Sequence, residues 1–451
     1  MKKIGFIFIL YPLISTSLVY GRRIQKTTFS IIQKIDFQQW LNRLKTIKQA
    51  LGPQEELSQL ISQFLHLDTL ILEKLTSIES VLKVILELSQ TISKGEDLGR
   101  EEIDLALKTF KKAYNYLTFI PRLQNGQIPV NEDIDILVHS YGISFYNHNV
   151  YFEFSDELLK KYQDFLLRVG PSGIVTVIGI TSEGERHILA ETAIVDLITP
   201  SANRSFEVIR NLSEGIKLKT GLVWNDILIV AKEGVEEQCE ITYRESNTSF
   251  QRELQKALSW IEKFYRGNCK QKFKYTSVIE IYPTPASFLG FITGGTIGEN
   301  GVVRVETSGN SFNLAFRILH ENVHLWFRSF NLTQPLLKDK ELAIRSTRFF
   351  REYWDKYRNV FLILTEICAY LEHSMFVSWI LNQPQIQKET PMVKWKYVRS
   401  QRNGFLKELN EQIELIEEEV FQKNFFTLEG EQFFERIKSQ FQHLYRDVLK
   451  L

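Results

Sequence analysis

The stretch Ala315–Phe327 reads AFRILHENVHLWF, and the rest of the chain is interpreted outward from it. Apolar residues surround its two histidines, and no glycine or proline interrupts them, so the stretch predicts a buried or half-buried helix. His320 and His324 are four residues apart and therefore lie on one face of that helix, where their imidazoles can converge on one ion. The pattern predicts a metal site that takes two ligands from this helix.

Glu321 directly follows the first histidine, so its side chain points to the side of the histidine face. From there its carboxylate can hold a water bound to the metal rather than the metal itself. Zinc lowers the pKa of such a water to near neutrality and polarises a carbonyl group. We therefore predict Zn2+ on the two histidines and Glu321 as the general base.

A catalytic zinc needs a third protein ligand and an open fourth position. The stretch Val360–Trp379 reads VFLILTEICAYLEHSMFVSW and predicts a second, largely apolar helix. Glu366 is an isolated acid there, and a carboxylate in such surroundings is costly unless it is paired or bound to a metal. Glu372 and His373 are rivals, but we expect both to lie nearer the exposed side of the helix. Glu366 is the preferred third ligand, and the two rivals stay open.

Together the two stretches resemble the gluzincin metallopeptidases, particularly the bacterial group called peptidase MA-like. The likeness rests on HENVH followed by TEICAYLE, in which Glu366, Ala369 and Tyr370 match the family's Glu-x-x-Ala-(Glu)-Tyr segment. It covers roughly residues 235–385. The resemblance implies that this Glu and the two motif histidines, His320 and His324, bind the zinc.

The resemblance also implies an α+β fold with a zincin-like catalytic domain, which is a mixed sheet plus helices. The segments VIEIYPTPASF and VVRVE before the motif helix look like the strands of that family's N-terminal sublobe. In these enzymes the strand before the motif helix lies at the sheet edge, and Val302–Glu306 would fill that place. An open row of N–H and C=O groups binds an extended peptide by strand addition, so the expected partner is a peptide or protein substrate.

The first part of the chain has a helical pattern. Apolar residues at spacings of three and four run from Leu57 to Leu88 and favour a helical hairpin packed within its own domain over an intermolecular coiled coil. A further helix at Glu101–Phe119 is expected to end before Pro121, where a linker follows. A domain boundary near residue 125 follows from this pattern.

Strands dominate the next part. The segments Ile174–Ile180, His187–Leu197 and Ile227–Ala231 predict strands of a small β-rich module. A short strand at 240–244, a helix at 249–265 and a strand at 277–282 then lead to the motif helix. The predicted parts are a signal peptide or N-terminal anchor at 1–21, a helical region at 22–125, a β-containing module at 126–234 and a zincin-like domain with C-terminal helices at 235–451.

The beginning of the chain predicts export. Two lysines precede an apolar run from Ile4 to Leu13, and small residues follow it, as in a secretory signal; an uncleaved membrane anchor is the alternative. We expect a periplasmic, secreted or cell-envelope protein that meets the membrane only through this segment. Cys239 and Cys269 could pair in such a compartment, whereas Cys368 fits a buried apolar position.

Charge excludes one class of partner. The chain has 55 basic and 54 acidic residues and a net charge of +1, so it has no broad electrostatic attraction for nucleic acid. The leading hypothesis is zinc-dependent hydrolysis of peptide bonds in an exported protein. The competing hypothesis is a non-catalytic envelope interaction or scaffold protein with a degenerate or structural zinc site, motivated by the amphipathic stripe and the long spacer between His324 and Glu366.

Overall fold

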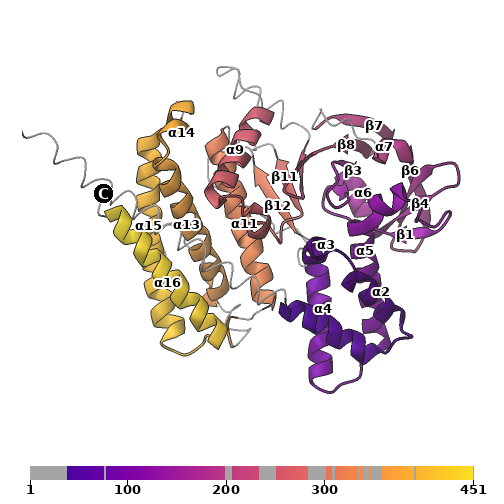
Figure 1. The fold of residues 1–451 in the computed structure, drawn as a ribbon, viewed down its shortest axis with the longest axis horizontal. Coiled ribbons are helices and arrows are strands. Elements are labelled where there is room, and N and C mark those ends of the chain that lie inside the picture. The colour runs from indigo at the N-terminus through magenta and orange to yellow at the C-terminus, as the bar shows by residue number, and fades with distance from the viewer. Residues whose placement is uncertain are drawn as a thin grey trace, which may run out of the picture.

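The computed structural model describes residues 38–75, 78–198, 206–232, 250–282, 301–306, 310–333, 336–338, 346–347, 358–390 and 393–449. The fold is α+β, as expected from the sequence. Figure 1 shows the N-terminal helices and a β-rich module at one end of the molecule and the C-terminal helices at the other. A small sheet and the motif helix lie between them.

The N-terminal helices enclose a core of their own. They are a helix over residues 38–51, α2 (Glu56–Leu65), α3 (Thr69–Lys74), α4 (Glu79–Ser93) and α5 (Arg100–Gln124). The apolar stripe read from the sequence is buried there: Leu57 and Phe64 of α2 and Leu82 and Leu88 of α4 share one core with Phe110 of α5. The stripe is divided among α2, α3 and α4 and is covered within the chain.

Helix α5 is longer than the sequence pattern predicts. It continues through Pro121 to Gln124 instead of ending at Phe119. A proline inside a helix removes the hydrogen bond that its N–H would have made, but here less than one turn remains beyond it. Phe119, Ile120 and Leu123 are all buried in the core of the next module, and this burial outweighs the lost bond. The expected end at Phe119 is therefore wrong.

The β-rich module contains two antiparallel sheets around one core. The first has the order β1 (Asp133–Asp135), β4 (Asp164–Val169), β5 (Ile174–Ile180), β6 (Arg186–Ala193). The second has the order β2 (Gly142–Ile143), β3 (Val150–Phe154), β8 (Ile216–Thr220), β7 (Val208–Ser213). Helix α6 (Asp156–Lys161) connects β3 to β4. The strand expected at His187–Leu197 ends at Ala193, and α7 (Ile194–Ile198) follows it directly.

A third sheet supports the motif helix. Its order is β12 (Val302–Glu306), β11 (Val278–Tyr282), β10 (Ile227–Ala231), β9 (Leu222–Trp224). β10, β11 and β12 are parallel, and β9 is antiparallel to β10. β9 and β10 precede the domain boundary expected between residues 234 and 235, whereas β11 and β12 follow it. The expected boundary therefore divides the strands of one sheet. The strand expected at 240–244 lies outside the described residues.

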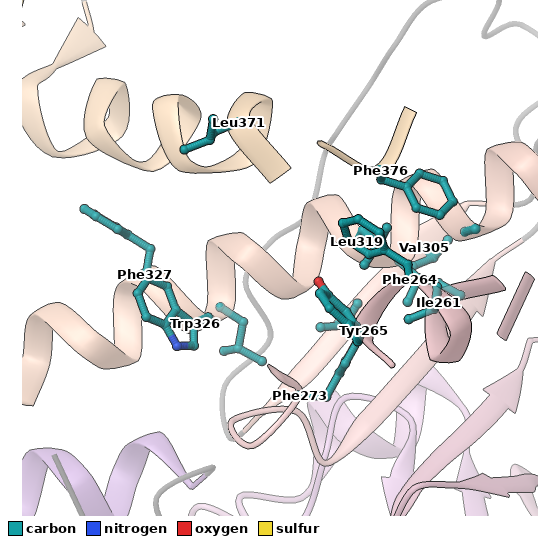
Figure 2. Close-up of a cluster of buried hydrophobic side chains, with 14 of the residues drawn as sticks. Ile261, Phe264, Tyr265, Phe273, Val305, Leu319, Trp326, Phe327, Leu371 and Phe376 are labelled. Carbon is teal, nitrogen blue, oxygen red and sulfur yellow. The ribbon is translucent and has the colours of Figure 1, made fainter. Parts of the chain in front are cut away.

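Helices cover this sheet and complete the C-terminal part. They are α9 (Phe250–Tyr265), α10 (Cys269–Lys272), α11 (Ser311–Thr333), α13 (Val360–Leu381), α14 (Pro384–Glu389), α15 (Trp395–Ile416), the π-helical turn η2 (Glu417–Phe421) and α16 (Leu428–Leu449). A two-stranded pair, β13 (Ser346–Thr347) and β14 (Arg358–Asn359), precedes α13. Aromatic side chains from α9, α11 and α13 fill the shared core, as Figure 2 shows for Phe264, Phe327 and Phe376. This core holds α11 and α13 side by side.

Among the described residues one helix, α13, is long and apolar enough to cross a membrane. However, 72% of its apolar window is buried within the protein, as in a core helix. Cys368 of this helix is half-buried and Cys269 is buried, and both are free thiols. The pairing considered for Cys269 involves Cys239, which lies outside the described residues.

A buried ion network connects the β-rich module to the third sheet. Glu280 of β11 is fully buried, and its Oε2 accepts hydrogen bonds from Ser140 Oγ at 3.2 Å and from Arg304 Nε at 3.2 Å. Lys232 Nζ lies 3.4 Å from the other oxygen. Because a buried carboxylate is costly without such partners, this contact fixes the module against the sheet in one arrangement.

The same junction contains a histidine that should make folding pH-dependent. His139 is 4% exposed, and its ring stacks on Tyr141 at 5.3 Å and meets the edge of Tyr116 at 5.7 Å. Burial lowers the pKa of His139 to about 4. The unfolded chain takes up this proton near pH 6.5 and the folded chain only near pH 4, so stability is full above pH 6.5 and falls as the pH decreases.

We expect His139 to cost about 2 kcal/mol of folding free energy on going from pH 7.5 to pH 5. His139→Phe keeps an aromatic ring but cannot bind a proton, so its midpoint of thermal unfolding should fall less over this pH range. The measurement is unfolding followed by circular dichroism at both pH values, with exposed His443→Phe as the control. An equal fall in the variant and the unaltered protein would contradict the prediction.

Candidate metal centre

Helix α11 contains the whole HENVH motif. It begins after Asn310, whose Oδ1 accepts a hydrogen bond from the backbone N–H of Asn313 at 2.9 Å, a typical N-cap contact. Ala315, Ile318 and Leu319 are fully buried, and this apolar burial orients the helix on the sheet.

The two motif histidines converge as their spacing predicts. The Nε2 atoms of His320 and His324 are 2.7 Å apart, with ring centroids 4.4 Å apart and ring planes at 76°. Two nitrogens this close share one proton, which one ring donates to the lone pair of the other. Both Nε2 atoms therefore face the same small space, and a metal ion could bind both rings from there once that proton is released.

The protonation state of His320 suits metal binding. Its side chain is 9% exposed, and burial first, then the neighbouring His373, His324 and Arg317, lowers its pKa well below 6.5. The ring is therefore neutral at pH 7, which is the form that binds metal ions. Its Nδ1 is buried without a hydrogen-bond partner among the described residues, so none of these residues orients the ring from behind through Nδ1.

Glu321 lies beside this pair in surroundings that suit a base. It is 9% exposed, and burial raises the pKa of its carboxyl to about 7, with Arg317 acting in the opposite direction and Glu306 adding to the rise. Arg317 Nη1 donates a hydrogen bond to the backbone carbonyl oxygen of Glu306 at 3.1 Å and lies 3.3 Å from the side-chain Oε2 of the same residue. A pKa near the working pH is what a general base needs.

The third expected ligand, Glu366, lies on α13, which runs antiparallel to α11. His373 of α13 stacks on His320, and further along the two helices Phe361 meets Phe327 at 5.1 Å. Glu366 lies on the stretch of α13 between His373 and Phe361, which packs along the His320–Phe327 stretch of α11.

Glu366 also shares a face of α13 with His373. The two residues are seven apart, two turns of the helix, so their side chains leave it in nearly the same direction. Glu366 is half-buried, and its Oε2 accepts a hydrogen bond from Gln412 Nε2 of α15 at 3.3 Å. Among the described residues no three His, Cys, Asp or Glu side chains form a group that could hold a metal. The structure thus brings the two histidines together and shows the Glu366 carboxylate hydrogen-bonded to Gln412.

The two rival ligands do not lie on an exposed side, and that expectation is wrong. His373 is 1% and Glu372 6% exposed, because α13 is apolar around its whole circumference and thirteen of its 22 residues are buried. His373 stacks on Phe316 at 3.7 Å and on His320 at 4.8 Å and 22°. Since the lone pairs of stacked rings lie in parallel planes, these two histidines do not aim at one ion.

Strand β12 lies at one edge of the described sheet, as the resemblance implies. It pairs with β11 through Val302–Glu306, and its last residue, Glu306, is the partner of Arg317 beside the motif. The strand therefore ends next to Glu321. A peptide bound along this edge would approach the base.

Two contributions to the site have weak signals in the sequence. Gln412 holds Glu366 from a helix 46 residues away in the chain, and nothing in its local sequence indicates this. Arg317 precedes His320 by three residues, so helical spacing could have placed it beside the motif. Tertiary contacts decide both roles.

Neither a family model nor a curated protein sequence matches this chain.

Proposed function

We propose that this chain is a zinc-dependent peptidase of the gluzincin type, in which His320, His324 and Glu366 hold Zn2+ and Glu321 is the general base. The observation that carries the proposal is the 2.7 Å approach of the two Nε2 atoms beside a buried carboxyl group on the same helix. Two neutral imidazoles and one carboxylate are a donor set that zinc accepts in catalytic sites. The zincin-like fold of the surrounding domain is part of the proposal.

Bound there, zinc would supply a Lewis acid for the scissile carbonyl and lower the pKa of water. The protein's own groups perform the proton transfers. Glu321 takes a proton from the attacking water while the water oxygen forms a bond to the carbonyl carbon. The protonated carboxyl group of Glu321 then gives this proton to the leaving nitrogen as the C–N bond breaks. Arg317 holds Glu306 beside this base and keeps the end of β12 next to it.

The position of β12 at the edge of the sheet formed by the described residues supports an extended peptide as substrate. Unpaired N–H and C=O groups at a sheet edge bind a peptide backbone without reading its sequence. We place this activity outside the cytoplasm, on the basis of the predicted export signal at residues 1–21, which lies outside the described residues.

The hydrogen bond between Glu366 and Gln412 favours a second candidate function. If the Glu366 carboxylate stays on Gln412, the chain is an envelope interaction protein with an incomplete or structural metal site. The two functions differ in whether Glu366 contributes to metal affinity.

Zinc content separates them. We expect purified protein to bind about one zinc per chain. Loss of a residue that only hydrogen-bonds to a metal ligand weakens metal affinity by roughly 10- to 100-fold, and we expect His320→Ala and Glu366→Ala each to weaken zinc affinity by more than this. The measurement is equilibrium dialysis followed by elemental analysis. Exposed His443 provides the matched control, and His443→Ala should keep the zinc. A protein that binds no zinc, or a Glu366→Ala variant of unchanged affinity, would favour the interaction protein.

A further inference from the structure

A separate cavity lies on the other flank of α11 and α13. Val323 and Trp326 of α11 line it. Because successive side chains of an α-helix are rotated by about 100°, these two point away from the side of α11 that carries Glu321 and His324. Helix α16 closes it with Phe433. The cavity does not belong to the metal centre, and the proposed function does not use it.

Its walls are mostly apolar. Trp326 and Phe433 are each 5% exposed and Leu371 is 4% exposed. Tyr265 also lines the cavity, and Figure 2 labels it, Trp326 and Leu371 on three different helices. The cavity measures about 40 Å³, enough for a few atoms, so it admits the head of a small molecule.

Polar groups of both signs line the same space. Glu372 of α13 is 6% exposed; its carboxylate has a hydrogen bond with the Tyr265 hydroxyl, but its Oε1 is buried without a hydrogen-bond partner among the described residues. Arg436 of α16 is half-exposed and lines the cavity with no ion pair or hydrogen bond to the described residues. Lys272 is a third charged group, and burial lowers its pKa to about 8 while Glu372 opposes that shift.

A buried carboxylate oxygen without a donor is costly, and a ligand that supplies one would be bound with a corresponding gain. A purely anionic ligand would pair with Arg436 but leave Glu372 Oε1 without a donor. A purely cationic ligand would pair with Glu372 but add a third positive charge beside Lys272 and Arg436. A molecule with a positive and a negative group supplies a donor for Glu372 Oε1 and an acceptor for Arg436 without adding net charge.

We propose that this cavity binds a small zwitterion with an apolar body, a free amino acid such as alanine or valine, with its ammonium on Glu372 and its carboxylate on Arg436. The small volume admits the ammonium end, while the half-exposed Arg436 meets the carboxylate nearer the surface. The apolar walls from Trp326 and Leu371 contact the side chain. The site lies apart from the motif histidines and binds its ligand independently of them.

Calorimetric titration of the full chain with L-alanine and L-valine tests this. We expect saturable binding that is at least about 10-fold weaker for alaninamide and for propionate, each of which lacks one charge. Glu372→Gln and Arg436→Gln should each weaken alanine binding by a similar factor. Arg446→Gln, an exposed arginine on the same helix, should leave it unchanged.

The ligand series on the unaltered chain keeps the proposal testable even if a variant fails to fold. Absence of saturable binding of either amino acid overturns it, as does equal binding of alanine and propionate or of alanine and alaninamide. Binding of alanine should persist in the His320→Ala variant. That result separates this site from the proposed metal centre, so that failure of one does not count against the other.

Discussion

Replacing Glu321 with glutamine should abolish peptide hydrolysis while the protein keeps its zinc. Glutamine has nearly the same shape but cannot accept a proton, and loss of a general base costs about 100- to 10,000-fold in turnover. The two histidines should still bind the metal, because Glu321 is proposed as the base and not as a ligand. The measurements are the turnover of a fluorogenic peptide mixture and the zinc content of the same sample.

The control for this experiment is Glu411→Gln on α15, where the acid is exposed and pairs only loosely with Lys407 at 3.9 Å. Its turnover should equal that of the unaltered protein. Full activity of Glu321→Gln would refute the role of this carboxyl group as the base. Loss of zinc together with activity would instead assign Glu321 to metal binding.

Phe376→Ala should cause a large loss of stability. The ring is fully buried where α9, α11 and α13 meet; its centroid lies 5.4 Å from Phe264 and 6.3 Å from Phe312, and Figure 2 shows it beside Phe264. Truncation leaves a cavity among rigid neighbours and should cost about 3–5 kcal/mol of folding free energy. The measurement is denaturant unfolding followed by circular dichroism.

The same substitution should weaken zinc binding, because Phe376 helps hold α13 against α11 and the proposed third ligand, Glu366, lies on α13. Leu362→Ala on the same helix is the control. Leu362 is 39% exposed, and its truncation should cost no more than about 1 kcal/mol. A Phe376→Ala protein as stable as this control would mean that the three-helix junction does not determine stability.

The local elements were predictable because short-range patterns specify them. The strands Ile174–Ile180, Ile227–Ala231 and Val302–Glu306 were predicted with the bounds that the structure gives them. Each is a short run of β-branched or apolar residues between turn residues, which leaves little freedom in its bounds. The continuation of α5 through Pro121 to Gln124 was not predictable, because burial of Phe119 and Leu123 in the next module decides it.

Within the candidate site, the sequence by itself determined the convergence of His320 and His324, since a spacing of four on a helix stacks two side chains whatever surrounds them. It also determined that Glu321 flanks them. Only the tertiary structure decided that Glu366 contacts Gln412 and that His373 stacks on His320. These relations depend on how α11, α13 and α15 pack, and that packing is set by buried side chains far apart in the sequence.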